Sequence, residues 1–259
     1  MQKPRFSIIM PAYNDGEFIG EAIESVLNQT YQSFELIVVD DGSTDNTPEV
    51  LSEFAEHPRV KTIRQKNGGT AAARNTGLCL ASGEYIGFLD SDDFYTPDRL
   101  AVIDNYLTEN RNVQCAATDH TIWNGERFSE PGAADGADEL IKYGLNLMTP
   151  VHFCALIIRA DIFQALGFFD PGFYYIEDVE MWYRLHAHGY AVHFINDCSY
   201  CYRRYGNINK TASGNSKGIH RDCIKIDVKY TFTRVVPLKM RLQCLRWLMG
   251  NMRKYVLNV

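Results

Sequence analysis

The stretch Phe34-Glu35-Leu36-Ile37-Val38-Val39-Asp40-Asp41-Gly42-Ser43 is a short apolar run that ends in two acids and a turn. The run predicts a buried β-strand, because apolar runs of this length bounded by turn residues are typical of strands. Residues 6–10, stopped by Pro11, form a similar run, and residues 85–89 form another that ends in acid. Apolar residues at helical spacing separate these runs. The sequence therefore alternates strands and helices.

Such alternation predicts an α/β fold with a parallel sheet. Ligands of these sheets bind beyond the carboxyl ends of the strands. Three polar clusters fall at those ends: Pro11-Ala12-Tyr13-Asn14, Asp40-Asp41 and Asp90-Ser91-Asp92-Asp93. We therefore expect one binding site that these clusters share.

The segment Asp90-Ser91-Asp92-Asp93 is a candidate metal site. Adjacent carboxylates repel each other unless a cation or hydrogen-bond donors neutralise them. Oxygen ligands suit Mg²⁺ or Mn²⁺, whose coordination is commonly completed by water and phosphate oxygens. The alternative is a helix cap, because Thr96-Pro97 begins a helix nearby.

Two further segments suit a nucleotide. Asp40 can accept hydrogen bonds from a base or a ribose, although a turn with a helix cap explains the same residues. The glycine-rich turn at Gly68-Gly69 enters a helix that carries Arg74, and helix starts bind anions. This turn lacks the P-loop lysine and the GxGxxG spacing, which argues against a kinase or a dehydrogenase.

Glu177-Asp178 opens an amphipathic segment that contains Trp182. Acids at a helix start are favoured by the helix dipole, so the pair has a structural explanation. The functional alternative is a general base at the rim of a pocket, with Trp182 as an acceptor platform or as part of the core.

Together, these segments resemble the successive motifs of glycosyltransferase family 2. The motifs are, in order, Ser7-Ile8-Ile9-Met10-Pro11-Ala12-Tyr13-Asn14, Val38-Val39-Asp40-Asp41-Gly42-Ser43-Thr44-Asp45, Gly69 through Arg74-Asn75, Phe88-Leu89-Asp90-Ser91-Asp92-Asp93, and Glu177-Asp178 with Trp182 and Arg184-Leu185. The resemblance covers residues 5–205.

The resemblance implies a GT-A fold, with a Rossmann-like, mostly parallel sheet flanked by helices. It implies transfer of a sugar, with inversion, from a nucleotide-diphosphate donor to an acceptor hydroxyl. A UDP-sugar is the donor expected before GDP- or dTDP-sugars. The product would belong to surface polysaccharide or glycolipid, and the acceptor would be a saccharide or a lipid-linked saccharide. The residues implied at the donor are Pro11, Ala12, Tyr13, Asn14, Asp40, Asp41, Arg74, Asp90 and Ser91.

The same resemblance implies a divalent cation, Mn²⁺ or Mg²⁺, on Asp92 and Asp90. Asp178 is then the catalytic base, and Glu177 and Trp182 lie at the acceptor.

Three later residues are weaker candidates. Arg203 and Arg204 contact the diphosphate or are exposed strand arginines. His220 completes the metal site when the segment from Asn207 to Lys217 closes, or is a surface histidine.

We expect a catalytic domain over residues 1–218 and a basic helical tail over residues 219–259. Within the domain, residues 1–112 bind the nucleotide sugar and residues 113–218 bind the acceptor. From residue 221 onward the chain carries nine basic and two acidic residues, a net charge of +7, against −6 for the whole chain. The asymmetry indicates different partners for the two parts.

The tail contains an apolar seam at Leu238, Leu242, Leu245, Met249, Met252 and Val256. A basic amphipathic helix of this kind lies on an anionic surface such as the inner membrane, docks on its own catalytic domain, or pairs with a second copy in a homodimer.

Composition narrows the class of protein. The overall charge of −6 argues against nucleic-acid binding. No stretch approaches the roughly 20 apolar residues that span a bilayer. Seven cysteines without a disulfide rhythm favour a cytoplasmic protein, peripheral to the membrane if the tail binds lipid.

Two rival functions are weighed against transfer. One is a non-catalytic module that binds nucleotide sugars. The other is a sugar-phosphate nucleotidyltransferase, which would need a glycine- and arginine-rich loop where this chain has Ala12-Tyr13-Asn14-Asp15-Gly16.

Overall fold

The computed structural model describes residues 3–126, 128, 152–204, 216–233, 236 and 238–257. A single sheet of eight strands occupies its centre, in the order β3-β2-β1-β4-β7-β6-β8-β5. The strands are β1 (Phe6–Ala12), β2 (Phe34–Asp40), β3 (Val60–Arg64), β4 (Tyr85–Phe88), β5 (Phe94–Tyr95), β6 (Cys115–Trp123), β7 (Leu156–Arg159) and β8 (Val192–Arg203).

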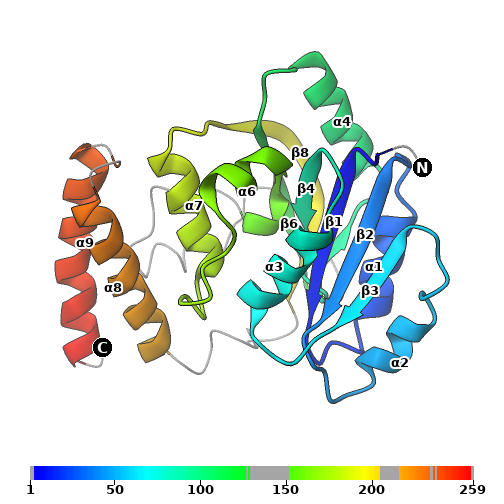
Figure 1. Cartoon of the computed structure of the whole chain (residues 1–259), viewed down its shortest axis with the longest axis horizontal. Coiled ribbons are helices and arrows are strands. Elements are labelled where there is room, and N and C mark those ends of the chain that lie inside the picture. Colours follow the sequence, from blue (N-terminus) through cyan, green and yellow to red (C-terminus); the bar gives the residue numbers. More distant parts are fainter. Residues whose placement is uncertain are drawn as a thin grey trace.

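Helices flank the sheet, and further helices lie beyond it on one side of the molecule (Figure 1). They are α1 (Ile19–Leu27), α2 (Thr47–Ser52), α3 (Thr70–Leu80), α4 (Arg99–Glu109), the 3-10 turn η1 (Phe153–Ala155), α6 (Ala160–Leu166), α7 (Glu177–Ala187), α8 (Ser216–Phe232) and α9 (Leu238–Leu257). In Figure 1, α7, α8 and α9 follow one another outward from the sheet, and α9 is the outermost.

The first four strands form the predicted parallel layer. β1 pairs in parallel with β2 and β4, and β2 pairs in parallel with β3. All seven residues of β1 and all seven of β2 are buried, because helices cover both faces of these strands. Burial on both faces explains why the sequence shows continuous apolar runs here instead of alternation.

The sheet is mostly parallel, as predicted, but its second half adds antiparallel pairs to the parallel pair of β6 and β8. β7 runs antiparallel to both β4 and β6, and β5 runs antiparallel to β8. β7 follows the 3-10 turn η1 directly and leads at once into α6.

A second apolar core joins the C-terminal helices to the rest. Tyr183 and Val179 of α7 pack with Cys223 and Ile226 of α8 and with Cys244 of α9. The predicted tail therefore shares a core with the helix that begins at the Glu177-Asp178 pair. None of the helices in the described part of the chain is long and apolar enough to cross a membrane.

Candidate active site

The loops after β1 and β2 are tied to each other at the carboxyl end of the sheet. Asn14 has a positive φ of 57°, which suits asparagine better than most residues. Its side-chain oxygen accepts hydrogen bonds from the backbone N–H of Thr44 at 2.7 Å and of Asp45 at 3.3 Å. Its own N–H donates to the Ser43 hydroxyl at 3.0 Å. Asn14 thus shapes the predicted nucleotide edge of the sheet.

The other residues predicted at this edge differ in access. Pro11 and Ala12 are buried in β1, whereas Tyr13 is 47% exposed. Asp40 is buried at the end of β2, and its carboxylate accepts the Ser43 N–H at 2.8 Å. Of these four, Tyr13 is the side chain open to an incoming ligand.

Asp41 supports the glycine-rich loop. Both of its oxygens accept the Gly68 N–H, at 2.9 and 3.1 Å, and one accepts the Gly69 N–H at 2.7 Å. The Gln65 side-chain amide donates to the other oxygen at 2.7 Å. Because the carboxylate is buried and occupied by its own chain, the prediction that Asp41 contacts the nucleotide is wrong in this conformation.

Arg74 links the two halves of the molecule instead of facing open space. Its guanidinium donates to a carboxylate oxygen of Asp90 and to one of Glu177, each at 3.0 Å. It is buried and lies against the rings of Phe88, Phe153 and Phe169, 5.5 to 5.9 Å from their centroids. One cation therefore neutralises two carboxylates that lie 87 residues apart in the chain.

The position of Arg74 between Asp90 and Glu177 influences the pKa of both carboxyl groups. Burial raises the pKa of Asp90, but the charges of Arg74 and His152, together with hydrogen bonds from Arg74 and Cys154, hold that pKa below the usual value. Burial also raises the pKa of Glu177, to about 7, where the Asp178 charge adds to burial and Arg74 compensates only in part. Asp90 is therefore ionised at neutral pH, and Glu177 titrates there.

The rest of the acidic segment is fixed by neighbouring elements. Ser91 donates to Asp15 at 2.6 Å. Asp93 is fully buried and accepts hydrogen bonds from the Tyr200 hydroxyl and the Arg203 N–H. Burial raises the pKa of Asp93, and the charges of Asp92 and Asp90 raise it further. The segment thus concentrates negative charge on Asp90 and Asp92.

A divalent cation fits this pair of carboxylates. Asp92 is partly exposed, as is Asp90, and carboxylate oxygens are the ligands that Mn²⁺ and Mg²⁺ prefer. The field that raises the pKa of Asp93 comes from the same two acids, and a cation beside them would relieve it. The helix-cap alternative is not favoured, because α4 has no side-chain cap hydrogen bond at Asp98.

A second group of ligand-type atoms lies behind this pair. Atoms of Asp90, His152 and Cys154 lie within 4.8 Å of one another, the one group of three in the described residues. Arg74 approaches the Cys154 sulfur at 3.6 Å. Burial, and then the Asp90 charge, raise the pKa of that thiol, so it stays protonated and is a weak metal ligand. Neither His152 nor Cys154 lies in a motif that the sequence analysis identified.

His220 is buried on α8 and does not belong to the group of Asp90, His152 and Cys154 found among the described residues. Its prediction as a metal ligand depends on closure of the segment from Asn207 to Lys217, and residues 207–215 lie outside the described residues.

Arg203 was predicted either to contact the diphosphate or to be an exposed strand arginine, and the structure places it in contacts within its own chain. Its guanidinium pairs with Glu21 at 2.7 Å and donates to the Asp92 carbonyl at 2.8 Å. It lies against the rings of Phe18 and Phe94 and is buried. Arg203 therefore fixes the backbone of the acidic segment, while Arg204 is partly exposed after it.

The two acids in the first turn of α7 differ in their exposure to solvent. Glu177 is buried on Arg74, whereas Asp178 is partly exposed and accepts the N–H of Val179 at 2.7 Å. Asp178 keeps the access that a general base needs. Trp182 is 3% exposed and packs edge-on against Phe153, so the prediction of an acceptor platform there is wrong. Nine of the eleven residues of α7 are buried, since it lies between both cores.

The loop before α7 holds a residue that the sequence analysis missed. Tyr174 is 56% exposed, and its ring lies so close to Gly69 that a Cβ there would be 3.3 Å away. The buried carboxylate of Asp222 accepts the N–H of Tyr174 at 2.9 Å and of Tyr175 at 3.2 Å. The exposed aromatic at this border therefore comes from a turn, and α8 holds it in place.

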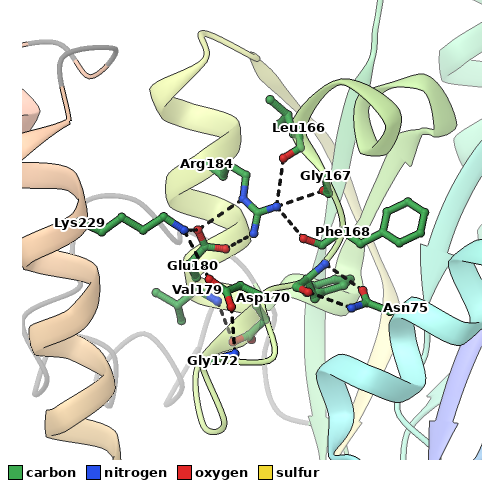
Figure 2. Close-up of polar contacts among 12 residues, drawn as sticks. Asn75, Leu166, Gly167, Phe168, Asp170, Gly172, Val179, Glu180, Arg184 and Lys229 are labelled. Carbon is green, nitrogen blue, oxygen red and sulfur yellow. Dashed lines mark hydrogen bonds and ion pairs between the residues drawn. The ribbon is translucent and has the colours of Figure 1, made fainter.

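A polar network fixes the same loop from the other side (Figure 2). Arg184 donates to the carbonyls of Leu166, Gly167 and Phe168 and to the buried carboxylate of Glu180. Lys229 of α8 donates to Glu180 at 2.7 Å.

Asn75 holds Phe169, the residue after Phe168. Its side-chain oxygen accepts the Phe169 N–H at 2.9 Å, and its side-chain nitrogen donates to the Phe169 carbonyl at 2.8 Å (Figure 2). Arg74 and Asn75, neighbouring residues of α3, thus hold the start of α7 and the loop before it.

Comparisons with known proteins agree with this architecture. The family model described as Glycosyl transferase family 2 matches residues 7–167. Chondroitin synthase of Escherichia coli is 45% identical over 116 residues, which make up 44% of this chain and 17% of that protein. An uncharacterized glycosyltransferase of Rickettsia typhi is 31% identical over 191 residues, 70% of this chain and 58% of that protein. The chain thus spans less than two thirds of the length of either relative.

Two solved structures share the fold. S. aureus TarS 1-349 in complex with UDP-GlcNAc has a TM-score of 0.71 at 20% identity, over 97% of this chain and 73% of that chain. The mannosyltransferase PcManGT from Pyrobaculum calidifontis, in complex with GDP-Man and Mn²⁺, has a TM-score of 0.70 at 20% identity, over 99% and 73%. The predicted GT-A fold is confirmed.

Proposed function

The chain belongs to glycosyl transferase family 2, and we propose that it transfers a sugar from a nucleotide-diphosphate donor to an acceptor hydroxyl, with inversion at the transferred carbon. The observation that carries the proposal is the Arg74 bridge. It holds Asp90, at the donor edge of the sheet, and Glu177, next to Asp178, on one guanidinium at 3.0 Å each.

The donor is proposed to be a UDP-sugar. UDP-GlcNAc is bound by TarS, which has the same fold, and GDP-Man by PcManGT. In this chain the base and ribose would lie at the edge formed by the loops after β1 and β2, with Tyr13 accessible beside them. The buried Asp40 and Asn14 shape that edge through hydrogen bonds to the loop that starts at Ser43.

Asp90 and Asp92 would hold a divalent cation, Mn²⁺ or Mg²⁺, together with diphosphate oxygens and water. When bound, the cation supplies positive charge beside the departing nucleoside diphosphate. Arg204, which follows the buried Arg203, is the remaining candidate for contact with the diphosphate.

Asp178 is the proposed base. A single carboxylate that takes the proton of the attacking hydroxyl is sufficient for inversion, because no covalent intermediate forms. Glu177 beside it is buried and bound to Arg74, so it fixes the start of α7 instead of taking the proton. The exposed ring of Tyr174 at the same border takes the place that we predicted for Trp182 at the acceptor.

The proposed acceptor is a saccharide or a lipid-linked saccharide in the synthesis of surface polysaccharide or glycolipid. Chondroitin synthase, a relative over 116 residues, is consistent with a saccharide acceptor. All seven cysteines are free thiols, which supports a cytoplasmic location.

The test is release of free nucleoside diphosphate from a panel of UDP-, GDP- and dTDP-sugars with saccharide acceptors and Mn²⁺. We expect acceptor-dependent release of UDP from at least one UDP-sugar, with an inverted anomeric product by NMR. Tight donor binding without release for any acceptor would instead favour a non-catalytic binding module. Pyrophosphate as the product would indicate a nucleotidyltransferase.

A further inference from the structure

The apolar seam of α9 is exposed in the folded chain. Leu238, Leu242, Leu245, Met249 and Met252 are 66%, 58%, 40%, 64% and 51% exposed. They are spaced alternately by four and three residues, so they lie on one face of the helix. Isolated exposed leucines are ordinary, but five on one face form a contiguous patch that indicates an interaction site.

The seam is not used to attach α9 to its own domain. That attachment uses a different face, where Cys244 is fully buried, Leu248 is 9% exposed, and Trp247 contacts the ring of Tyr183. Both Cys244 and Trp247 belong to the second core with α7 and α8. Docking on the catalytic domain and exposure of the seam therefore coexist, and α9 is the outermost helix in Figure 1.

The positive charge of α9 favours an anionic surface over a second copy of the chain as the partner of the seam. The sequence of α9 contains five lysines and arginines and no aspartate or glutamate. Arg246 is exposed, and Arg241 is partly exposed beside the seam. A second copy that paired through this seam would bring two such helices, each with a net charge of +5, into contact. An anionic surface would neutralise the same charge.

We propose that the Leu238–Met252 face of α9 lies on an anionic lipid bilayer. At about 1.5 Å per residue, the 20 residues of α9 give a helix about 30 Å long. Its apolar face would enter the boundary between headgroups and acyl chains, while Arg241 and Arg246 meet the lipid phosphates. The helix lies on the membrane and does not cross it, in agreement with the lack of a spanning helix among the described residues.

The proposal does not depend on glycosyl transfer, and its test is independent of activity. The full chain is floated with vesicles of phosphatidylcholine alone and of phosphatidylcholine with phosphatidylglycerol. We expect binding to the anionic vesicles only, weakened by added salt. The double variant Leu242→Gln, Met249→Gln should lower the partition coefficient about tenfold or more, because it removes apolar burial.

Controls separate lost binding from lost folding. Leu80→Gln changes another exposed leucine, 42% exposed on α3, and should bind vesicles like the wild type. Arg246→Glu reverses one charge on an exposed side chain and should weaken anionic binding while the apolar seam stays intact. Circular dichroism and thermal unfolding check that each variant folds.

Light scattering in solution measures whether the chain instead forms a dimer through this seam. If the wild-type chain does not bind anionic vesicles, the proposal is wrong. A dimer that the Leu242→Gln, Met249→Gln variant splits, without vesicle binding by the wild type, would assign the seam to a second copy instead.

Discussion

The guanidinium of Arg74 and the carboxylate of Glu177 lie 3.0 Å apart, across 103 positions of the sequence. This contact joins α3, which follows the glycine-rich loop, to the first turn of α7. Because Arg74 also holds Asp90 at 3.0 Å, the acid proposed for the donor site and the turn that carries Asp178 have a fixed spacing. The site is therefore organised before any ligand arrives, and each of its acids supports a separate prediction.

Replacing Asp178 by Asn should leave donor binding unchanged and lower the transfer rate by about 100- to 10,000-fold, the range for loss of a general base. Asn has the same shape and still accepts the Val179 N–H. The measurement is kcat beside the Kd for UDP. Near-wild-type turnover would remove Asp178 from the role of base.

Replacing Asp92 by Ala should weaken Mn²⁺-dependent UDP binding by about 10- to 100-fold, because it removes one of two carboxylates proposed for the cation. Calorimetry at several Mn²⁺ concentrations measures this. Glu56→Ala, an exposed acid just before β3 at the opposite end of the sheet, is the control and should bind normally. If Asp92→Ala retained the full Mn²⁺ dependence, the ligand assignment would be wrong.

Glu177 should make folding stability depend on pH near neutrality. Its pKa is raised from 4.5 to about 7 by burial and by Asp178, against the opposing charge of Arg74. Between these values the folded chain keeps a proton that the unfolded chain has lost, so the free energy of unfolding decreases as pH rises through this window. The full contribution is on the order of 3 kcal/mol.

Urea unfolding of the wild type and of Glu177→Gln at a series of pH values isolates this effect. The variant cannot titrate at this position, so the difference between the two free energies should change across the window between about pH 4.5 and pH 7. A difference that stays constant with pH would contradict the assignment.

Asp222 should act as a positioning residue although it is part of α8. Asp222→Asn weakens the acceptors for the N–H groups of Tyr174 and Tyr175, just before the turn that carries Asp178. We expect kcat to fall roughly ten- to a hundredfold through misplacement of the base, with little change in KM for the donor.

Lys217→Gln, an exposed change on the same helix, is the control for Asp222 and should have a normal kcat. A loss in thermal stability for Asp222→Asn with unchanged kcat would show that Asp222 supports only the fold.

The first half of the fold was predictable because its signals are local. β1 and β2 are buried throughout, so their apolar runs are continuous, and the polar residues after them meet at one edge for topological reasons. The antiparallel entry of β7 was not predictable, since it depends on a strand that pairs with β4 from 70 residues away.

The site was predictable as a set of residues but not in its roles. Arg74 and Asp41 lie where the motifs indicate, yet both serve buried contacts that no local pattern reveals. The resemblance placed Trp182 at the acceptor, with the core as the alternative. Trp182 is instead buried in the first core against Phe153, and sequence spacing does not show which partners cover a helix. Tyr174 was missed for the converse reason, because it lies in a turn without periodicity.

Calorimetric titration of the full chain with UDP, with and without Mn²⁺ and with GDP for comparison, tests the central claim most directly. The account predicts metal-dependent binding of UDP, stronger than that of GDP, which Asp92→Ala weakens and Asp178→Asn leaves intact. Absence of metal-dependent binding for both nucleotides would contradict the proposed donor site.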